Sequence, residues 1–349
     1  MKKLHRLMAS GAALALLGSV AGQALAADIS GAGATFPYPV YAKWAEAYKM
    51  QTNIGLNYQS IGSGGGIKQI EASTVTFGAS DKPLEPADLK KNGLVQWPMI
   101  IGGVVPVVNI PGINPGDLVL DGPTIAAIYL GDISRWNDAA IKKLNPKLAL
   151  PKLDIAPVYR SDGSGTNFLF TNYLSQASPT FKQKIGADTS VQWPVGIGAK
   201  GNEGVANQTM QTSGAIGYVE YAFVKQTKMT YAKLLNHDGK YVAPEAKAFQ
   251  AAAANADWAK ADGYYLILTD QPGAETWPIT GASFILMHAD SKDPQASAAL
   301  KFFDWAYKNG QKLASDLDYV PLPDKVTKQV EKTWVDALKV NGQPAWPAK

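Results

Sequence analysis

Residues 159–168, with the sequence YRSDGSGTNF, combine one arginine, one aspartate and several hydroxyl side chains around two glycines. Arginine is scarce after residue 26, so Arg160 in a Gly-Ser turn favours a role for its rigid fork of donors. Asp162 can hold that guanidinium in place; the alternative is a surface ion pair of little energetic value. The turn leads into a helical pattern whose first N–H groups lie at the positive end of the helix dipole. We therefore predict an anion site that includes Ser164 and Thr166 as hydroxyl donors.

Two further glycine-rich stretches have the same arrangement. GAGATFPYP places Thr35 and Phe36 before a helix that Pro37 is suited to begin, and IGSGGGIKQ places Ser63 before a helix expected at residues 67–72. Glycines allow the backbone to approach an oxyanion closely, and each hydroxyl can donate a hydrogen bond to it. One such stretch alone is more often a plain helix cap. Three of them in one chain indicate a shared ligand.

Asp81, in the stretch FGASDKPL, indicates which anion that ligand is. An ionised carboxylate only accepts hydrogen bonds, so it repels a fully deprotonated oxyanion and favours one that carries a proton. Phosphate near neutral pH carries at least one proton, whereas sulfate carries none. The alternative is that Asp81 caps a turn before Lys82 and Pro83.

The elements that must position these residues alternate between strand and helix patterns. Runs at 104–110, 215–224 and 283–289 are strand-like, whereas 38–50 and 324–340 have the periodicity of amphipathic helices. The alanine-rich stretch AFQAAAANADWAKA also indicates a helix. Such alternation predicts an α/β protein.

Two Trp-Pro segments, at 96–109 and 276–289, each continue through an apolar run into a strand. We interpret both as chain crossings between two lobes. The first lobe then comprises residues 27–105 and 278–349, and the second comprises 106–277. A cleft between the lobes is the expected ligand site.

The N-terminal 26 residues have a basic start, an apolar middle and an Ala-Leu-Ala end, which predicts a secretory signal peptide. Of 349 residues, 323 would remain after its removal, with 30 of the 33 Lys and Arg residues against 29 Asp and Glu. This near-neutral balance argues against a nucleic-acid binder or a polybasic membrane-surface protein.

The absence of cysteine excludes disulfides, thiolate metal sites, Cys nucleophiles and a lipid-anchored Cys. His237 and His288, the two histidines beyond the signal peptide, are a poor basis for a zinc site or a catalytic triad. We expect no cofactor and no metal. The predicted location is the periplasm, without a lipid anchor.

The chain resembles the periplasmic phosphate-binding proteins that supply the high-affinity phosphate ABC transporter of bacteria. The resemblance extends over nearly all of the chain after the signal peptide. It is carried by motifs in family order: GAGATFPYPVYAKW, IGSGGGIKQI, FGASDKPL, IIGGVVPVVNIPG, IYLGDISRWND, RSDGSGTNFLFT, GAIGYVEYAF, TWPIT, FFDWAYKNG and LDYVPLP.

This resemblance implies a two-lobed periplasmic-binding-protein fold of type II, with two chain crossings and a phosphate held by closure of the lobes. Phe36 and Gly165 would contribute backbone N–H groups, and Asp162 would pair with Arg160 beside the ligand. The implied phosphate-binding residues are Thr35, Phe36, Ser63, Asp81, Arg160, Asp162, Ser164, Gly165 and Thr166. The implied partners are inorganic phosphate and the membrane permease subunits of the transporter, with the protein itself a monomer.

Three alternatives stay open at this stage. A secreted phosphatase would need a metal cluster or an activated nucleophile, and neither G-x-S-x-G nor G-x-x-x-x-G-K-[ST] occurs. A binder of sulfate, molybdate or tungstate on the same fold would give Asp81 no proton to accept. A second role as an adhesin or scavenger has no characteristic residue pattern by which the sequence could reveal it.

Overall fold

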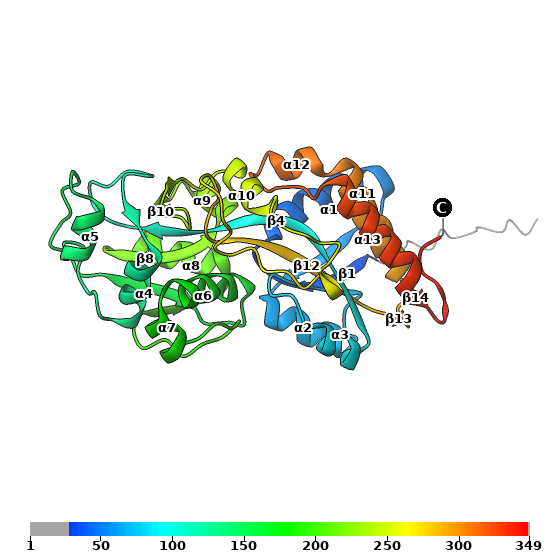
Figure 1. Ribbon diagram of the computed structural model, residues 1–349. Helices are drawn as coiled ribbons and strands as arrows, with labels where there is room; N and C mark the ends of the chain where they lie inside the picture. The colour runs from blue at the N-terminus through cyan, green and yellow to red at the C-terminus, as the bar shows by residue number, and fades with distance from the viewer. Residues whose placement is uncertain (1–27, 348–349) are drawn as a thin grey trace, which may run out of the picture.

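A nine-stranded sheet runs through both ends of the computed structural model, which describes residues 28–347 (Figure 1). In spatial order its strands are β2 (Leu56–Ser60), β1 (Ile29–Gly33), β3 (Phe77–Ser80), β12 (Thr280–His288), β4 (Leu94–Val108), β8 (Ala215–Glu220), β6 (Ala156–Arg160) and β7 (Ile197–Ala199), with β9 (Thr230–Tyr231) also paired to β4.

Strand β4 is shared by the two ends of the molecule. Its first part pairs with β12, from Leu94 opposite His288 to Gly103 opposite Thr280, and its second part pairs with β8 from Val104 onwards. The exchange of partners therefore occurs between Gly103 and Val104. We call the part built on β2, β1, β3, β12 and the start of β4 the first lobe, and the part built on the rest of β4, β8, β6 and β7 the second lobe.

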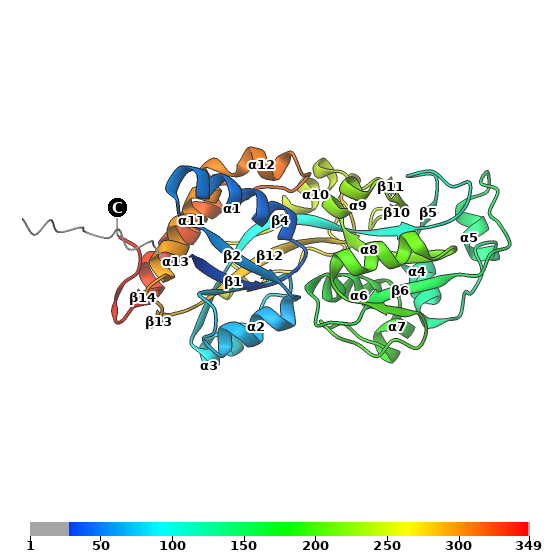
Figure 2. The same ribbon diagram turned by 180° about the vertical axis from the view of Figure 1, so that it is seen from behind.

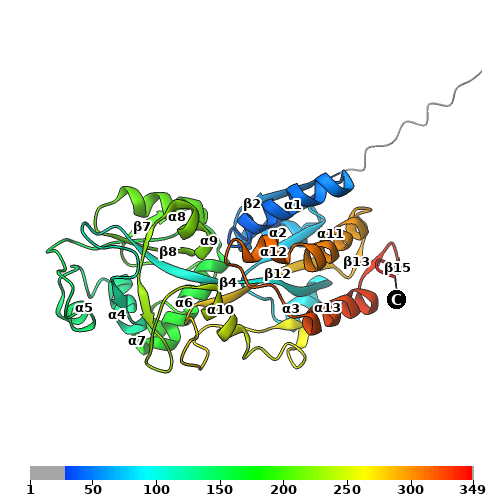
Figure 3. The same ribbon diagram turned by 90° about the horizontal axis from the view of Figure 1, so that it is seen from above.

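Helices cover the sheet in each lobe (Figures 1 and 2). Those of the first lobe are α1 (Tyr38–Thr52), α2 (Ser63–Glu71), α3 (Pro86–Asn92), α11 (Ala296–Asn309), α12 (Gln311–Ser315) and α13 (Asp324–Ala337). Those of the second lobe are α4 (Gly122–Leu130), α5 (Ala139–Leu144), α6 (Gly165–Ala177), α7 (Pro179–Lys184), α8 (Gly201–Gln211) and α9 (Tyr221–Thr227). The view from above shows the two sets on opposite sides of the β4 crossing (Figure 3).

Smaller elements complete the fold. They are the sheet of β5 (Val119–Leu120), β10 (Lys233–Leu235) and β11 (Tyr241–Val242), the sheet of β13 (Asp290–Ser291), β14 (Lys339–Val340) and β15 (Gln343–Pro344), helix α10 (Ala246–Ala253) and a 3₁₀ turn at Asp262–Tyr264. Helix α10 lies against β4 and β12, close to where the chain passes between the lobes.

The predicted α/β alternation is confirmed, and the two Trp-Pro segments lie on β4 and β12, which run side by side. The strand expected over 215–224 is wrong in its second part. It ends at Glu220, whose side chain accepts the N–H of Ala222 and so caps α9.

Three helix predictions were also wrong at their ends. The helix expected over 324–340 ends at Ala337, and Lys339–Val340 form β14. Helix α2 begins at Ser63 rather than at residue 67, because the glycine run is itself helical and the left-handed residue is Gly62, with φ of 91°. The alanine-rich segment is helical only as far as Ala253. The predicted signal peptide, residues 1–26, lies outside the described residues. Within residues 28–347, no helix is both long and apolar enough to cross a membrane.

Candidate functional site

The starts of helices α1, α2 and α6 meet between the lobes. Each of them follows a strand of a parallel pair, β1, β2 or β6, and so begins at the carboxyl edge of the sheet, where α/β proteins place their ligands. Two contacts join α2 to the start of α6: the N–H of Gly64 donates to the carbonyl of Gly163 at 2.9 Å, and the N–H of Gly165 donates to Ser63 Oγ at 3.0 Å. Backbone donors of both lobes therefore converge on one point.

Thr35 and Thr166 are joined through Asn202, at the start of α8. Asn202 Nδ2 donates to Thr35 Oγ1 at 2.6 Å and to Thr166 Oγ1 at 3.1 Å, and the backbone N–H of Asn202 reaches Thr35 Oγ1 at 3.2 Å. All three side chains are buried. Because Thr35 Oγ1 accepts these hydrogen bonds, its own hydrogen remains available to a ligand.

Ser63 and Ser164 have related roles at the starts of α2 and α6. Ser63 Oγ accepts from the N–H groups of Asp81 and Gly165, at 3.1 and 3.0 Å, so its hydroxyl hydrogen is left to donate. Ser164 is the N-cap of α6, where its Oγ accepts from the N–H of Asn167 at 3.0 Å. Both serines are fully buried. Each therefore stabilises a helix start and keeps one hydrogen to donate.

Arg160 ends β6 with its guanidinium enclosed. Nε and Nη2 donate to the two carboxylate oxygens of Asp162 at 2.8 and 2.6 Å, which is a bidentate pair. Nη1 is buried and has no hydrogen-bond partner among residues 28–347. Burial alone would raise the pKa of Asp162, but the hydrogen bonds and charge of Arg160 and the N–H of Gly201 hold it below its usual range. Arg160 thus keeps one free pair of donors in an otherwise satisfied ion pair.

Asp81 follows β3 on the opposite side of the same site. The residue is 1% exposed, and neither carboxylate oxygen has a hydrogen-bond partner within the described part of the chain. Burial raises the pKa of Asp81 to about 7, although Ser283, the charge of Arg160 and Ser63 oppose the rise. A Cβ on Gly165 would lie 2.6 Å from Asp81 Oδ2, so this oxygen faces the start of α6. Asp81 is therefore an acceptor aimed between the lobes.

The backbone of Phe36 is held by Tyr319, a residue near the C-terminal end of the chain. Tyr319 OH lies 2.6 Å from the carbonyl oxygen of Phe36 and 2.8 Å from Glu220 Oε2. Tyr319 OH is the donor in both contacts, so its one hydrogen is shared between the two oxygens unless Glu220 carries a proton of its own. Burial raises the pKa of Glu220 well above its usual range, which favours this protonated form.

The structure brings all nine residues of the predicted site together between the lobes. Sequence reasoning missed four buried neighbours: Asn202, Glu220, Ser283 and Tyr319. Asn202 follows Gly201, whose φ is 74°, so the KGNEG stretch carries a weak turn signal. The other three lie within strands or an irregular segment and carry no local signal.

These groups can bind an anion through neutral dipoles, one cation and one acceptor. The helix starts and hydroxyls supply partial positive charge, while Arg160 is already balanced by Asp162. In residues 28–347, no cluster of three or more His, Asp or Glu side chains is placed to hold a metal ion. The arrangement therefore favours binding of a protonated oxyanion.

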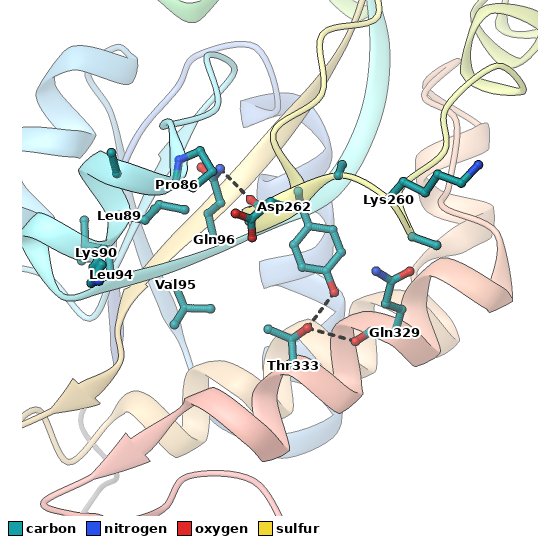
Figure 4. Close-up of a pocket in the computed structure, with 15 residues that line it drawn as sticks. Pro86, Leu89, Lys90, Leu94, Val95, Gln96, Lys260, Asp262, Gln329 and Thr333 are labelled. Atoms are coloured by element: carbon teal, nitrogen blue, oxygen red, sulfur yellow. Dashed lines mark hydrogen bonds between the residues drawn. The ribbon is translucent and has the colours of Figure 1, made fainter.

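A separate cavity lies in the first lobe, and Figure 4 shows it between α3, the start of β4, the 259–264 segment and α13. Its volume is about 770 Å³, and none of the nine site residues lines it. Its buried Gln96 donates to the carbonyls of Leu84 and Gly263, and the Tyr264 hydroxyl contacts Thr333. This cavity is therefore distinct from the site between the lobes.

A family model, curated relatives and solved structures all match this chain. A family model described as a PBP superfamily domain matches residues 18–309. The phosphate-binding protein PstS of Xylella fastidiosa (strain Temecula1) is 54% identical over 318 residues, which are 91% of this chain and 87% of that protein. The protein of the same name from Pasteurella multocida (strain Pm70) is 51% identical over 323 residues, covering 92% and 94%. A crystal structure of a phosphate-binding protein from Stenotrophomonas maltophilia, 22% identical, superposes with a TM-score of 0.66 over 92% of this chain and 98% of that one.

Proposed function

The chain belongs to the phosphate-binding proteins of the PBP superfamily, and on that premise we propose that it binds inorganic phosphate between its lobes. The two-lobed periplasmic-binding-protein fold predicted from the sequence is confirmed. One observation carries the proposal: Arg160 Nη1 and both oxygens of Asp81 are buried at the site without partners in residues 28–347. Buried polar groups are nearly always satisfied, so an unpaired donor and an unpaired acceptor that share a site point to a ligand offering both.

Each of the nine residues has a role in this proposal. The hydroxyls of Thr35, Ser63, Ser164 and Thr166 and the N–H group of Phe36 donate to phosphate oxygens. The N–H of Gly165, which donates to Ser63 Oγ in this structure, would exchange that partner for a phosphate oxygen. Arg160 donates through Nη1 and is held by Asp162. Asp81 accepts from a P–OH group, which a charge-assisted hydrogen bond makes short and strong.

We further propose that phosphate closes the two lobes and that the closed form delivers it to an ABC-type phosphate importer. The contacts between Gly64 and Gly163 and between Ser63 and Gly165 support closure, because they join segments on either side of the β4 crossing. The lobe boundaries at 105/106 and 277/278 stay a proposal. So do export through residues 1–26, a periplasmic location without a lipid anchor, and a monomeric state with permease subunits as partners.

The relatives are named as binding proteins, and we propose that this chain has no catalytic activity. Ser63 and Ser164 each accept a backbone N–H at a helix start, and neither His237 nor His288 is among the nine site residues, so no imidazole base is placed there to activate a serine. Release of inorganic phosphate from a chromogenic phosphate ester by the pure protein would contradict this.

Isothermal titration with phosphate and with sulfate tests the function. One phosphate should bind per chain, and sulfate should bind far more weakly because it offers Asp81 no proton. Equal affinity for the two anions would assign the site to oxyanions in general, and no heat with phosphate would overturn the proposal. Small-angle scattering should also show a smaller radius of gyration on phosphate addition. An unchanged profile at saturation would indicate a rigid, preformed site.

A further inference from the structure

Ser283 lies where β12 passes the end of β3. The antiparallel register places Leu286 opposite Gly78 and Phe284 opposite Ser80, so the next pair in the same register is Ser283 opposite Asp81. On its other edge, β12 meets an irregularity: Ser283 pairs with Ile100 and Phe284 with Pro98, which leaves Met99 of β4 as an extra residue. Bulges of this kind re-aim side chains near functional sites. Ser283 is thus placed beside Asp81.

Three side chains at this point are buried without hydrogen-bond partners among residues 28–347. They are Asp81, through both carboxylate oxygens, Ser283, through Oγ, and Tyr41 of α1, through its hydroxyl. Burial raises the pKa of Asp81 and of Tyr41, and the Ser283 hydroxyl opposes the rise in both. Ser283 therefore acts on both Asp81 and Tyr41. Four unpaired oxygens in one cluster are unusual in a folded protein and call for an explanation.

We propose that Ser283 is a positioning residue for Asp81, donating its hydroxyl hydrogen to one carboxylate oxygen and accepting a hydrogen bond from Tyr41. Each hydroxyl has one hydrogen, and an ionised carboxylate only accepts, so this is the direction that satisfies Asp81, Ser283 and Tyr41 together. Because Oδ2 faces Gly165 and the start of α6, Oδ1 is the oxygen left for Ser283. Oδ2 is then held toward the ligand as an acceptor.

The inference rests on the proposed function and specifies how its selectivity arises. A donor on Oδ1 favours the ionised form of Asp81, which accepts from P–OH and repels an oxygen that carries no proton. Without that donor, a larger fraction of Asp81 is protonated, and a neutral carboxylic acid can donate to sulfate. The titratable groups that act on Asp81 or are acted on by it are Tyr41, Tyr58, Arg160, Glu220 and Tyr319. Of these, Arg160 is the cation and lies in the second lobe.

The test compares the wild type with Ser283→Ala by titration with inorganic phosphate and with sulfate across pH 5.5 to 8.5. We expect phosphate affinity at neutral pH to fall about tenfold, the effect of losing one hydrogen bond to a charged group, while sulfate affinity holds or rises. We also expect the pH at which phosphate affinity declines on the acid side to move upward, because Asp81 is easier to protonate. A merely structural role would weaken both anions equally and leave the pH profile in place.

Two further variants keep the test decisive. Tyr41→Phe removes the second link and should shift the phosphate-to-sulfate ratio in the same direction by a smaller factor, which also serves if Ser283→Ala fails to fold. Thr280→Val is the matched control: it removes a buried hydroxyl from the same strand that donates to the carbonyl of Trp277, and it should leave the ratio unchanged. Failure of the wild type to bind phosphate would overturn the proposed function. Wild-type binding with an unchanged ratio and pH profile in Ser283→Ala, or in Tyr41→Phe if the first does not fold, would overturn this inference alone.

Discussion

Arg160 and Asp81 are the two charged residues that face each other across the site, and their surroundings differ sharply. Arg160 is 3% exposed and is neutralised by Asp162 through two hydrogen bonds. Asp81 is 1% exposed and has no such partner among the described residues. The second lobe therefore contributes a balanced ion pair, whereas the first contributes an isolated carboxylate.

The difference shows how one site can attract an anion and still select its protonation state. Asp162 has a lowered pKa and stays ionised, so the Arg160–Asp162 pair adds no net charge. Asp81 has a pKa raised to about 7, so it changes charge near neutrality. Attraction must then come mainly from helix starts and hydroxyls, while Asp81 decides which anion is accepted.

Removing Arg160 tests the Arg160–Asp162 ion pair and should cause the largest loss of phosphate affinity. Arg160→Ala deletes the Nη1 donor and leaves the largely buried Asp162 side chain without its partner. Truncating one member of a buried charge pair costs about 4 kcal/mol, which corresponds to about a thousandfold loss of phosphate affinity. Arg160→Lys should lose less, because it keeps a cation but not the fork. Isothermal titration measures both.

Arg135→Ala is the control for that variant. Arg135 pairs with Asp154 at the surface, with 54% and 83% of the two side chains exposed, and such pairs contribute little. It should bind phosphate as the wild type does. Equal affinity in Arg160→Ala and Arg135→Ala would remove Arg160 from the site.

The opposite pKa shifts of Asp81 and Asp162 predict opposite pH dependences of stability. The folded state binds a proton at Asp81 more tightly than the unfolded state does, so this residue's stabilising contribution is present at low pH and is lost as pH rises through about 7. Asp162 contributes stability above its unfolded pKa, and that contribution is lost as pH falls through its lower folded value. Urea unfolding without phosphate, compared between wild type and each Asn variant, measures the two terms.

Relative to Asp81→Asn, the wild type should lose a few kcal/mol of unfolding free energy between about pH 4 and pH 7. Relative to Asp162→Asn, the wild type should instead lose stability only as the pH falls below about 4. A difference curve for Asp81→Asn that is flat over that range would show that Asp81 ionises normally in the folded protein, and the contrast between the two sides would fail.

Asp81→Asn also tests the selective side through binding. The variant keeps the shape of the side chain and adds a donor, so a sulfate oxygen gains a partner while P–OH loses its carboxylate acceptor. The ratio of phosphate to sulfate affinity should fall about a hundredfold, since a site with a mismatched buried polar group discriminates strongly. Sulfate exclusion as strict as in the wild type would reduce Asp81 to a turn cap.

The sequence contained enough local information to predict the helix starts and the residues that meet there. Gly-rich turns before α1 and α6 can be recognised from fewer than ten consecutive residues, and the two Trp-Pro segments coincide with β4 and with the chain that leads into β12. That both segments are crossings between lobes stays a prediction. These predictions depended on short-range rules of capping and periodicity. That the nine residues act as phosphate ligands stays a prediction.

The buried neighbours of the site could not be predicted, because contacts between residues far apart in the sequence bring them there. Tyr319 reaches Phe36 across 283 positions of the chain, and Ser283 meets Asp81 only because β12 pairs with β3. Glu220 ends a strand as the cap of the next helix, which no strand-like periodicity over 215–224 could indicate. Asn202 joins threonines of both lobes, and it carries no hydrophobic pattern that would mark it as buried.

Gly165 of the second lobe lies against Ser63 and Asp81 of the first lobe. Substituting Gly165 tests how closely the two lobes must approach each other for phosphate to bind. An added Cβ would lie 2.5 Å from Ser63 Oγ and 2.5 Å from Asp81 Cβ, both in the first lobe, although Gly165 belongs to α6 of the second. Gly165→Ala must therefore hold the lobes slightly apart, at a cost of about 1.4 kcal/mol, or about a tenfold loss of phosphate affinity.

The matched control for Gly165→Ala is Gly204→Ala in α8, where the nearest atom would lie 3.6 Å from the new Cβ and alanine favours the helix. Gly204→Ala should bind phosphate as the wild type does and be slightly more stable. In Gly165→Ala, scattering at saturating phosphate should give a larger radius of gyration than the wild type has. Because the clash involves Asp81 as well as Ser63, the phosphate-to-sulfate ratio should fall together with the affinity. A variant that closes fully and keeps its affinity would mean that Asp81 and the start of α6 can separate without loss, and the two sides would then not act on one ligand.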